Sequence, residues 1–160
     1  MKKNIFFLII PALALMVSCN DIKVKFGECK TFTRSSSADT TDPEYDCIRY
    51  SYDAATEVLK ITHINTAFNC CITDVKIDIS KDDSIISISE SEKMANGPCD
   101  CSCLYDLDYS IESVKKGTYT IKVIEPYLSG NDEALEFEVD LGKLPEGTIC
   151  KKRSMYPWVL

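Results

Sequence analysis

The chain has 160 residues, of which 45% are hydrophobic and 27% are charged, and its formal net charge is −7. This length suits one domain and is too short for two domains of ordinary size. The acidic balance argues against a nucleic-acid partner, which would require a basic surface.

The first eighteen residues have the layout of an export signal. Two lysines precede an apolar run over residues 5–17, which Pro11 interrupts. The run is shorter than the roughly 20 apolar residues of a membrane-spanning helix. We therefore expect residues 1–18 to be removed. The remaining chain would have 16 basic and 25 acidic residues, a net charge of −9, because the signal contains two of the 18 basic residues.

The sequence MVSC, at residues 16–19, resembles the lipobox of bacterial lipoproteins, which a type II signal peptidase cleaves before the cysteine. The resemblance implies that Cys19 carries a covalent lipid and becomes the first residue of the mature protein. Buried methylenes contribute about 0.8 kcal/mol each to such an anchor. The alternative is ordinary secretion with cleavage after the triplet Ala12-Leu13-Ala14, but the apolar region continues past that point.

The number of cysteines supports lipidation. The chain has nine cysteines, and an odd number in an exported protein leaves one thiol to be explained. Lipidation of Cys19 would leave an even set in a compartment where disulfides persist. The eight disulfide candidates are Cys29, Cys47, Cys70, Cys71, Cys99, Cys101, Cys103 and Cys150.

Residues 19–44 are expected to form the lipidated cysteine and a tether to a domain over residues 45–160. The tether is rich in Ser, Thr and Asp and has few large apolar side chains. A bridge from Cys29 to the domain would shorten it.

From residue 45 onward, short runs of β-branched and aromatic residues alternate with turn residues. They predict seven strands, at residues 45–52, 57–64, 71–79, 84–93, 101–114, 118–125 and 134–141. Two of these runs alternate strictly between apolar and polar residues, which is typical of antiparallel sheets with one buried face. We therefore expect an all-β fold, an antiparallel immunoglobulin-like β-sandwich of about seven strands.

Three cysteines, Cys99, Cys101 and Cys103, occupy alternate positions at the start of the fifth predicted strand. They share the parity of the apolar residues Tyr105 and Leu107, so the pattern places their side chains on the buried face. Residues two apart on a strand are too distant to bridge each other. Each of the three thiols therefore needs a partner from elsewhere in the chain.

Cys70 and Cys71, at the start of the third predicted strand, are the first candidates for these partners. We expect two of the three alternate cysteines to bridge to them. The third would bridge to Cys29, Cys47 or Cys150, and the last two of these would pair together. The sequence leaves the connectivity open among these choices.

A metal or thiol-redox site is the alternative use of these sulfurs. Zn²⁺ or Cu⁺ could be held by thiolates and one imidazole. The alternative ligands are Cys70, Cys71, Cys99, Cys101, Cys103 and His63. The C-x-C-x-C spacing matches neither a zinc signature nor a C-x-x-C redox motif, and export favours disulfides. We expect His63 to be packed and hydrogen-bonded, and we expect no cofactor besides the lipid.

The remaining sequence offers little for catalysis, so we expect no enzyme. There is one histidine, no nucleophile elbow and no Gly-rich phosphate loop. A small envelope hydrolase is the second alternative, because a pair of carboxylates formed only in space would be invisible in the sequence. The basic run at 151–153 is expected to be a solvated turn, and the aromatic end at 155–160 is expected to fold back on the sandwich.

Four segments together resemble uncharacterised envelope lipoproteins of the Bacteroidota type. They are HINTAFNCC at 63–71, CDCSCLYD at 99–106, EPY at 125–127 and YPW at 156–158. The resemblance implies location and domain type but no activity. We expect a lipid-anchored protein of the outer membrane with a binding or structural role, whose partner is an envelope protein or a small ligand. Residues 20–24 lack the acidic run of a surface-export signal, which favours the periplasmic face.

Overall fold

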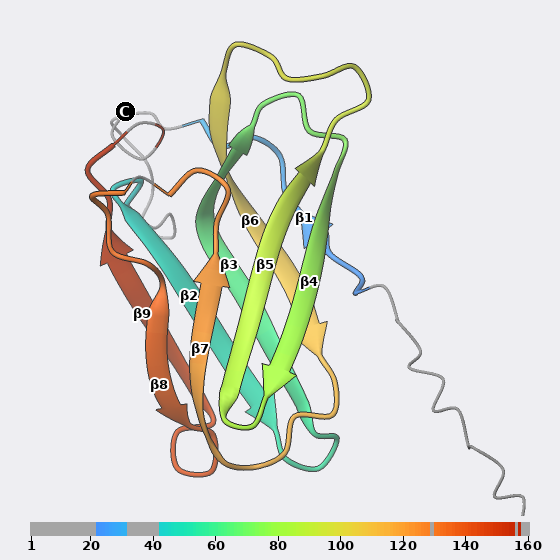
Figure 1. The fold of residues 1–160 in the computed structure, drawn as a ribbon, viewed down its shortest axis with the longest axis vertical. Helices are drawn as coiled ribbons and strands as arrows, with labels where there is room; N and C mark the ends of the chain where they lie inside the picture. The colour runs from blue at the N-terminus through green and yellow to red at the C-terminus, as the bar shows by residue number, and fades with distance from the viewer. Residues whose placement is uncertain (1–21, 32–41, 129, 156, 158–160) are drawn as a thin grey trace, which may run out of the picture.

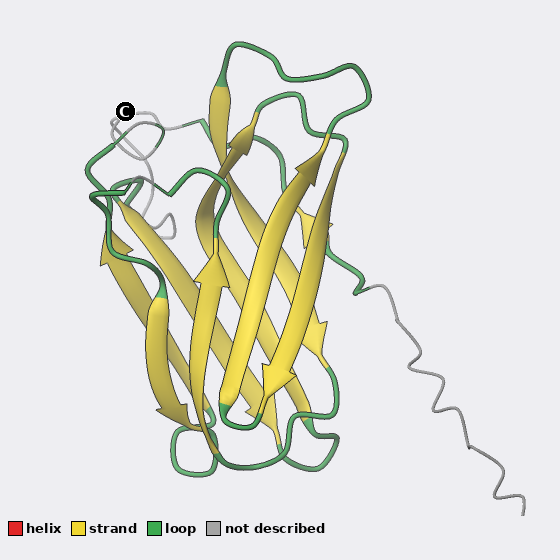
Figure 2. Ribbon diagram, viewed as in Figure 1, coloured by secondary structure: helices red, strands yellow, loops and turns green. Residues whose placement is uncertain are grey.

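Apolar and polar residues alternate along much of the chain, and these segments form β-strands throughout the domain. The computed structural model describes residues 22–31, 42–128, 130–155 and 157. Within these residues there are two packed β-sheets and no helix, with the loops gathered at the two ends of the strands (Figure 2). The predicted signal peptide and Cys19 lie outside the described residues.

Nine strands build the two sheets in the part of the chain that the structure describes (Figure 1). They are β1 (Lys25–Phe26), β2 (Tyr45–Asp53), β3 (Val58–Asn69), β4 (Asp74–Asp82), β5 (Ile85–Lys93), β6 (Ser102–Ile111), β7 (Thr118–Ile124), β8 (Glu136–Asp140) and β9 (Glu146–Lys152). One sheet has five strands in the order β1-β6-β3-β2-β9, and the other has four in the order β4-β5-β7-β8. The predicted all-β sandwich is confirmed, and the seven predicted strands correspond to β2 through β8.

One pair of strands departs from the antiparallel prediction. β5 and β7 run parallel, with Ile85 opposite Thr120 and Ser89 opposite Ile124. The intervening strand β6 belongs to the other sheet. The chain therefore crosses to that sheet and back between β5 and β7, and β7 runs in the same direction as β5. The prediction was wrong at this pair because alternation within a strand does not determine its neighbours.

The core lies between the two sheets and follows the predicted inward faces. In β6 the buried residues include Tyr105, Leu107, Tyr109 and Ile111, which share one parity. They meet aliphatic side chains of the four-stranded sheet, such as Ile88, in one hydrophobic cluster. Each fully buried aliphatic side chain contributes about 1.5–3 kcal/mol relative to exposure.

Part of the predicted tether belongs to the sandwich. β1 pairs with β6, and Ile22, Val24 and Phe26 pack against the core. These three residues alternate with lysines, which is the pattern of a half-buried strand. β1 lies at one edge of the five-stranded sheet (Figure 1).

The basic run at the C-terminal end is also part of the fold. Lys151 and Lys152 lie in β9, which pairs with β2, and Arg153 follows with only 1% of its surface exposed. The prediction of a solvated turn was therefore wrong, because buried carboxylates draw the Arg153 guanidinium inward. Within the predicted aromatic end, Met155 is exposed and Pro157 is buried. Residues 156 and 158–160 lie outside the described residues.

Among the described residues, no helical segment has the length and hydropathy needed to cross a membrane.

Candidate functional site

Four disulfides join the eight candidate cysteines. The bridges are Cys29–Cys103, Cys47–Cys150, Cys70–Cys101 and Cys71–Cys99. Two of the three alternate cysteines thus pair with the vicinal pair, the third pairs with Cys29, and the last two pair together. This is one of the arrangements that the sequence left open. Disulfides in this number indicate an oxidising environment outside the cytoplasm.

The predicted orientation of the alternate cysteines was wrong for two of them. β6 begins at Ser102, so Cys99 and Cys101 lie in the preceding loop and are exposed, whereas Cys103 is half-buried within the strand. The loop is held by Asn69 at the end of β3. Its Nδ2 donates to the Cys99 carbonyl at 2.7 Å, and the Cys99 amide donates to its Oδ1 at 3.0 Å. Side-chain hydrogen bonds therefore position this loop where the sequence predicted a continuing strand.

The alternative that the sequence left open, a sulfur-ligated metal site, does not form among the described residues. Sulfurs in disulfides have no thiolate to offer a metal ion, and this holds for Cys70, Cys71, Cys99, Cys101 and Cys103. His63 does not lie beside Cys71 either. It lies within β3, opposite Ile48 on one side and Leu107 on the other.

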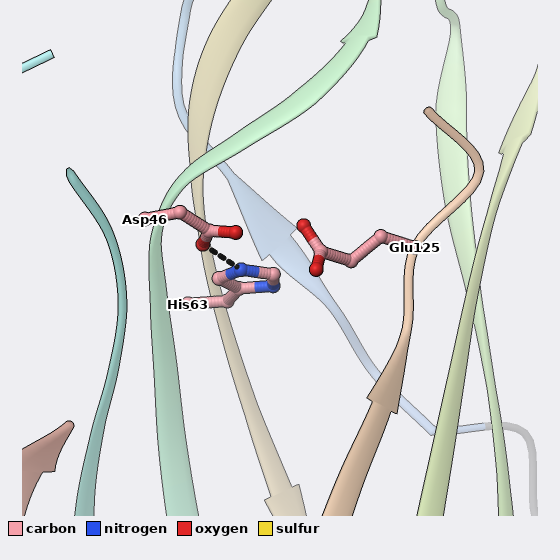
Figure 3. Close-up of side chains that lie close together, drawn as sticks. All are labelled: Asp46, His63 and Glu125. Carbon is pink, nitrogen blue, oxygen red and sulfur yellow. Dashed lines mark hydrogen bonds and ion pairs between the residues drawn. The ribbon is translucent and has the colours of Figure 1, made fainter. Parts of the chain in front are cut away.

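His63 is instead the centre of a group of buried charged side chains (Figure 3). Its Nδ1 lies 2.8 Å and 2.9 Å from the two carboxylate oxygens of Glu90, and its Nε2 lies 2.6 Å from Asp46 Oδ1. Burial alone would lower the pKa of His63, but the charges of Glu90 and Asp46 and their hydrogen bonds raise it well above the usual value. Both ring nitrogens therefore carry protons and donate to carboxylates.

Arg153 ties two carboxylates of this group together. Its Nε donates to Asp46 Oδ2 at 2.9 Å, and its Nη2 donates to the same oxygen and, at 2.8 Å, to Glu125 Oε2. Its Nη1 donates to the carbonyl of Glu133. We call the residues Asp46, His63, Glu90, Glu125 and Arg153 the buried charge cluster.

Glu125 is the member of the buried charge cluster whose carboxyl group is protonated, and therefore neutral, at neutral pH. Burial and the neighbouring charge of Asp46 raise the pKa of Glu125 to about 9. Burial would also raise the pKa of Asp46, but His63, a hydrogen bond from Glu125 and the charge of Arg153 lower it. At neutral pH the cluster then has two cations and two anions, with Glu125 neutral, so the interior charge is balanced.

Two neighbouring hydroxyl groups complete the hydrogen bonding of Glu90. Thr66 Oγ1 donates to Glu90 Oε2 at 3.1 Å, and Tyr109 Oη donates to Oε1 at 3.2 Å. Burial and the charge of Glu90 raise the pKa of Tyr109 well above its usual value, so the phenol keeps its proton. Three side chains of the five-stranded sheet therefore fix the orientation of Glu90, which comes from the other sheet.

Sequence reasoning missed four members of the buried charge cluster, although a signal was present. Asp46 shares the inward parity of Ile48 and Tyr50 in β2, and Glu90 shares that of Ile88 in β5. Glu125 continues the inward face of β7, where Val123 is buried. Each of these inward faces thus includes an ionisable residue, and such a coincidence on several strands indicates a buried polar cluster. Arg153 has no such signal, because it follows an edge strand.

An open hollow along the five-stranded sheet is a second candidate site. Exposed polar side chains of β2, β3 and β6 line it, among them Arg49, Ser51, Lys60, Asp108 and Ser110, and residues 77–79 of β4 in the other sheet line it as well. Cations and carboxylates alternate here, and hydroxyl groups lie between them. The surface offers hydrogen bonds of both kinds to a polar ligand.

Comparison of the chain with protein-family models, with curated proteins and with solved structures found no match. Its function must therefore be inferred from the chemistry of its own residues. The two features that carry such inferences are the cysteine framework and the buried charge cluster.

Proposed function

We propose that the chain is a lipid-anchored protein of the cell envelope whose oxidised β-sandwich has a binding or structural role. The observation that carries this proposal is the use of the cysteines. Four disulfides account for eight of the nine, and the ninth is Cys19, in the sequence that resembles a lipobox. A lipid on Cys19 would give every cysteine of the mature chain a covalent partner.

The start of the domain limits its distance from the membrane. Ile22 already packs against the core, so residues 19–21 alone would separate the lipid from the sandwich. An extended chain of three residues spans at most about 10 Å. The domain would therefore lie close to the lipid surface. The proposed location is the outer membrane. Residues 20–24 lack an acidic run, which favours its periplasmic face.

We further propose a role without catalysis. Asp46 and Glu125 do converge in space, as a hydrolase would require, but both side chains are buried and fixed by Arg153. Catalytic carboxylates must reach a substrate in a cleft. This arrangement favours binding over a small envelope hydrolase, and the open hollow along the five-stranded sheet is the proposed binding surface.

Metabolic labelling with an alkyne analogue of palmitate tests the anchor. We expect the wild-type protein, expressed in a Gram-negative host, to incorporate the label and to remain with the membranes. The variant Cys19→Ser should incorporate none. The variant Cys29→Ser is the matched control, because it removes one cysteine near the N-terminus but leaves the lipobox-like sequence intact, and it should be labelled. An unlabelled wild-type protein released in soluble form would refute the lipid anchor.

A further inference from the structure

Three side chains of the buried charge cluster are arranged like ligands of one cation. Asp46, His63 and Glu125 each offer a ligand atom, and these atoms all lie within 4.8 Å of one another. All three residues are buried. Figure 3 shows the Glu125 carboxylate turned toward His63 and Asp46, which come from the opposite sheet.

Arg153 leaves one oxygen of each carboxylate for this purpose. It binds Asp46 through Oδ2 and Glu125 through Oε2. Asp46 Oδ1 lies 2.6 Å from His63 Nε2. Glu125 Oε1 is buried and accepts no hydrogen bond in the structure. Because Oε2 accepts from Arg153, Oε1 is the oxygen that holds the proton of neutral Glu125, and a cation bound there would replace that proton.

The other side of His63 has the environment of a metal-binding imidazole. Nδ1 lies 2.8 Å from a carboxylate oxygen of Glu90, which is itself fixed by Thr66 and Tyr109. Histidines that bind metals commonly donate their other N–H to a carboxylate, which sets the tautomer and the ring orientation. Nε2 is then the nitrogen that faces the cation.

The charge of the cluster fits a divalent ion. Binding of a cation would release the proton of His63 Nε2 and that of Glu125. Three carboxylates would then stand against the single guanidinium of Arg153, which leaves two negative charges in the interior. A divalent cation would balance them. One nitrogen and two carboxylate oxygens suit Zn²⁺ and similar transition-metal ions better than Ca²⁺, which prefers six to eight oxygens.

We propose that Asp46 Oδ1, His63 Nε2 and Glu125 Oε1 bind one divalent transition-metal ion of the Zn²⁺ type. The ion takes the place of the hydrogen bond between Asp46 and His63. Ligands at about 2.0–2.1 Å from a tetrahedral ion lie roughly 3.3 Å apart, so these two side chains separate slightly on binding. Because the site is buried, the ion enters as the domain folds. This proposal does not depend on the lipid anchor.

Refolding in the presence of Zn²⁺ tests the proposal. The untagged mature chain, in detergent, is unfolded in guanidinium chloride with its disulfides intact and refolded with excess Zn²⁺. After dialysis, elemental analysis measures the bound metal. We expect one Zn²⁺ per chain, and Mg²⁺ in the same experiment should not be retained. Retention of no Zn²⁺ by the refolded wild-type protein would overturn the proposal.

The variant Glu125→Gln separates this site from adventitious binding. Glutamine has the shape and neutrality of protonated Glu125, so the variant should fold, and we expect its Zn²⁺ affinity to fall at least about tenfold. The matched control is Glu133→Gln, which makes the same change at an exposed carboxylate nearby. It should bind Zn²⁺ like the wild type. Equal binding by Glu125→Gln would place the ion elsewhere and refute the site.

Nitrogen NMR of the imidazole gives a second measurement on the same samples. His63 is the single histidine of the chain, so its two ring nitrogens give unambiguous signals. We expect Zn²⁺ to convert a doubly protonated ring into one with a proton on Nδ1 only and a metal on Nε2. An unchanged spectrum in protein that retains Zn²⁺ would exclude His63 as a ligand and overturn the proposal.

Discussion

At the scale of single residues, Arg153 is the charged side chain that connects the end of the last strand to the interior. It binds Asp46 on β2, Glu125 beyond β7 and the backbone of Glu133. Removing one partner from a buried ionic network leaves the others without compensation. The neighbouring pair of Lys152 and Glu44 has the same signs of charge but lies on the surface.

We predict that Arg153→Met lowers the free energy of unfolding by about 3–5 kcal/mol, because Asp46 loses its buried guanidinium. The control Lys152→Met removes an exposed ion pair and should cost about 0–1 kcal/mol. Guanidinium chloride unfolding, followed by tyrosine fluorescence with disulfides intact, measures both. Equal losses in the two variants would mean that the Arg153 contacts contribute no more than a surface pair.

Asn65 illustrates a residue whose role the sequence did not reveal. It has a positive φ of 66°, and the pairing of β3 with β6 shifts register at this point. Its Nδ2 donates to the carbonyl of Tyr45 at 2.7 Å. Asparagine tolerates the left-handed region and bulges need it, but an Asn within an apolar run also fits a loop. The prediction consequently ended this strand at residue 64, whereas β3 continues to Asn69.

At the scale of strands, the alternation of apolar and polar residues predicted those strands that have one solvent-exposed and one buried face. β6 and β8 alternate in this way and were found close to their observed positions. β9 was missed because it is an edge strand whose residues are alternately exposed and half-buried, so that no row of large apolar side chains marks it. β1 was missed because it is only two residues long, although its neighbours Ile22 and Val24 continue its pattern.

The bridge Cys29–Cys103 should hold β1 to the sandwich, since two residue pairs alone give few hydrogen bonds. We predict that Cys29→Ser/Cys103→Ser exposes lysines 23, 25 and 30 to trypsin and accelerates cleavage there by about tenfold or more. A bridge contributes about 2–4 kcal/mol, and cleavage requires local opening. Mass spectrometry over a digestion time course identifies the sites.

The control for this experiment is Cys47→Ser/Cys150→Ser, which removes a bridge at the opposite edge of the same sheet. It should leave cleavage within residues 22–31 slow. If both double variants are cut at these lysines at equal rates, the Cys29 bridge has no local role and β1 is held by packing alone.

At the scale of the whole molecule, the sandwich and its oxidised state could be inferred from alternation and cysteine parity, whereas the buried charge cluster could not. Its members come from β2, β3 and β5 and from the residues that directly follow β7 and β9, and only the packing of one sheet on the other brings His63 and Glu90 together. The parallel pair of β5 and β7 has the same origin, because it depends on which sheet β6 joins. Contacts between distant segments are properties of the assembled fold.

The disulfides also join segments that lie far apart in the sequence. Most bridges span long stretches of sequence, up to 103 residues for Cys47–Cys150, and each contributes about 2–4 kcal/mol. Four would give roughly 8–16 kcal/mol, as much as the entire stability of a typical domain, about 5–15 kcal/mol. The buried charge cluster adds a desolvation cost that the oxidised chain must offset. We therefore predict that reduction of all four bridges unfolds the domain at 25 °C without denaturant. Loss of near-ultraviolet circular dichroism and of amide dispersion on addition of a phosphine reductant measures this. A reduced chain that keeps its dispersion and its unfolding midpoint would show that packing alone suffices.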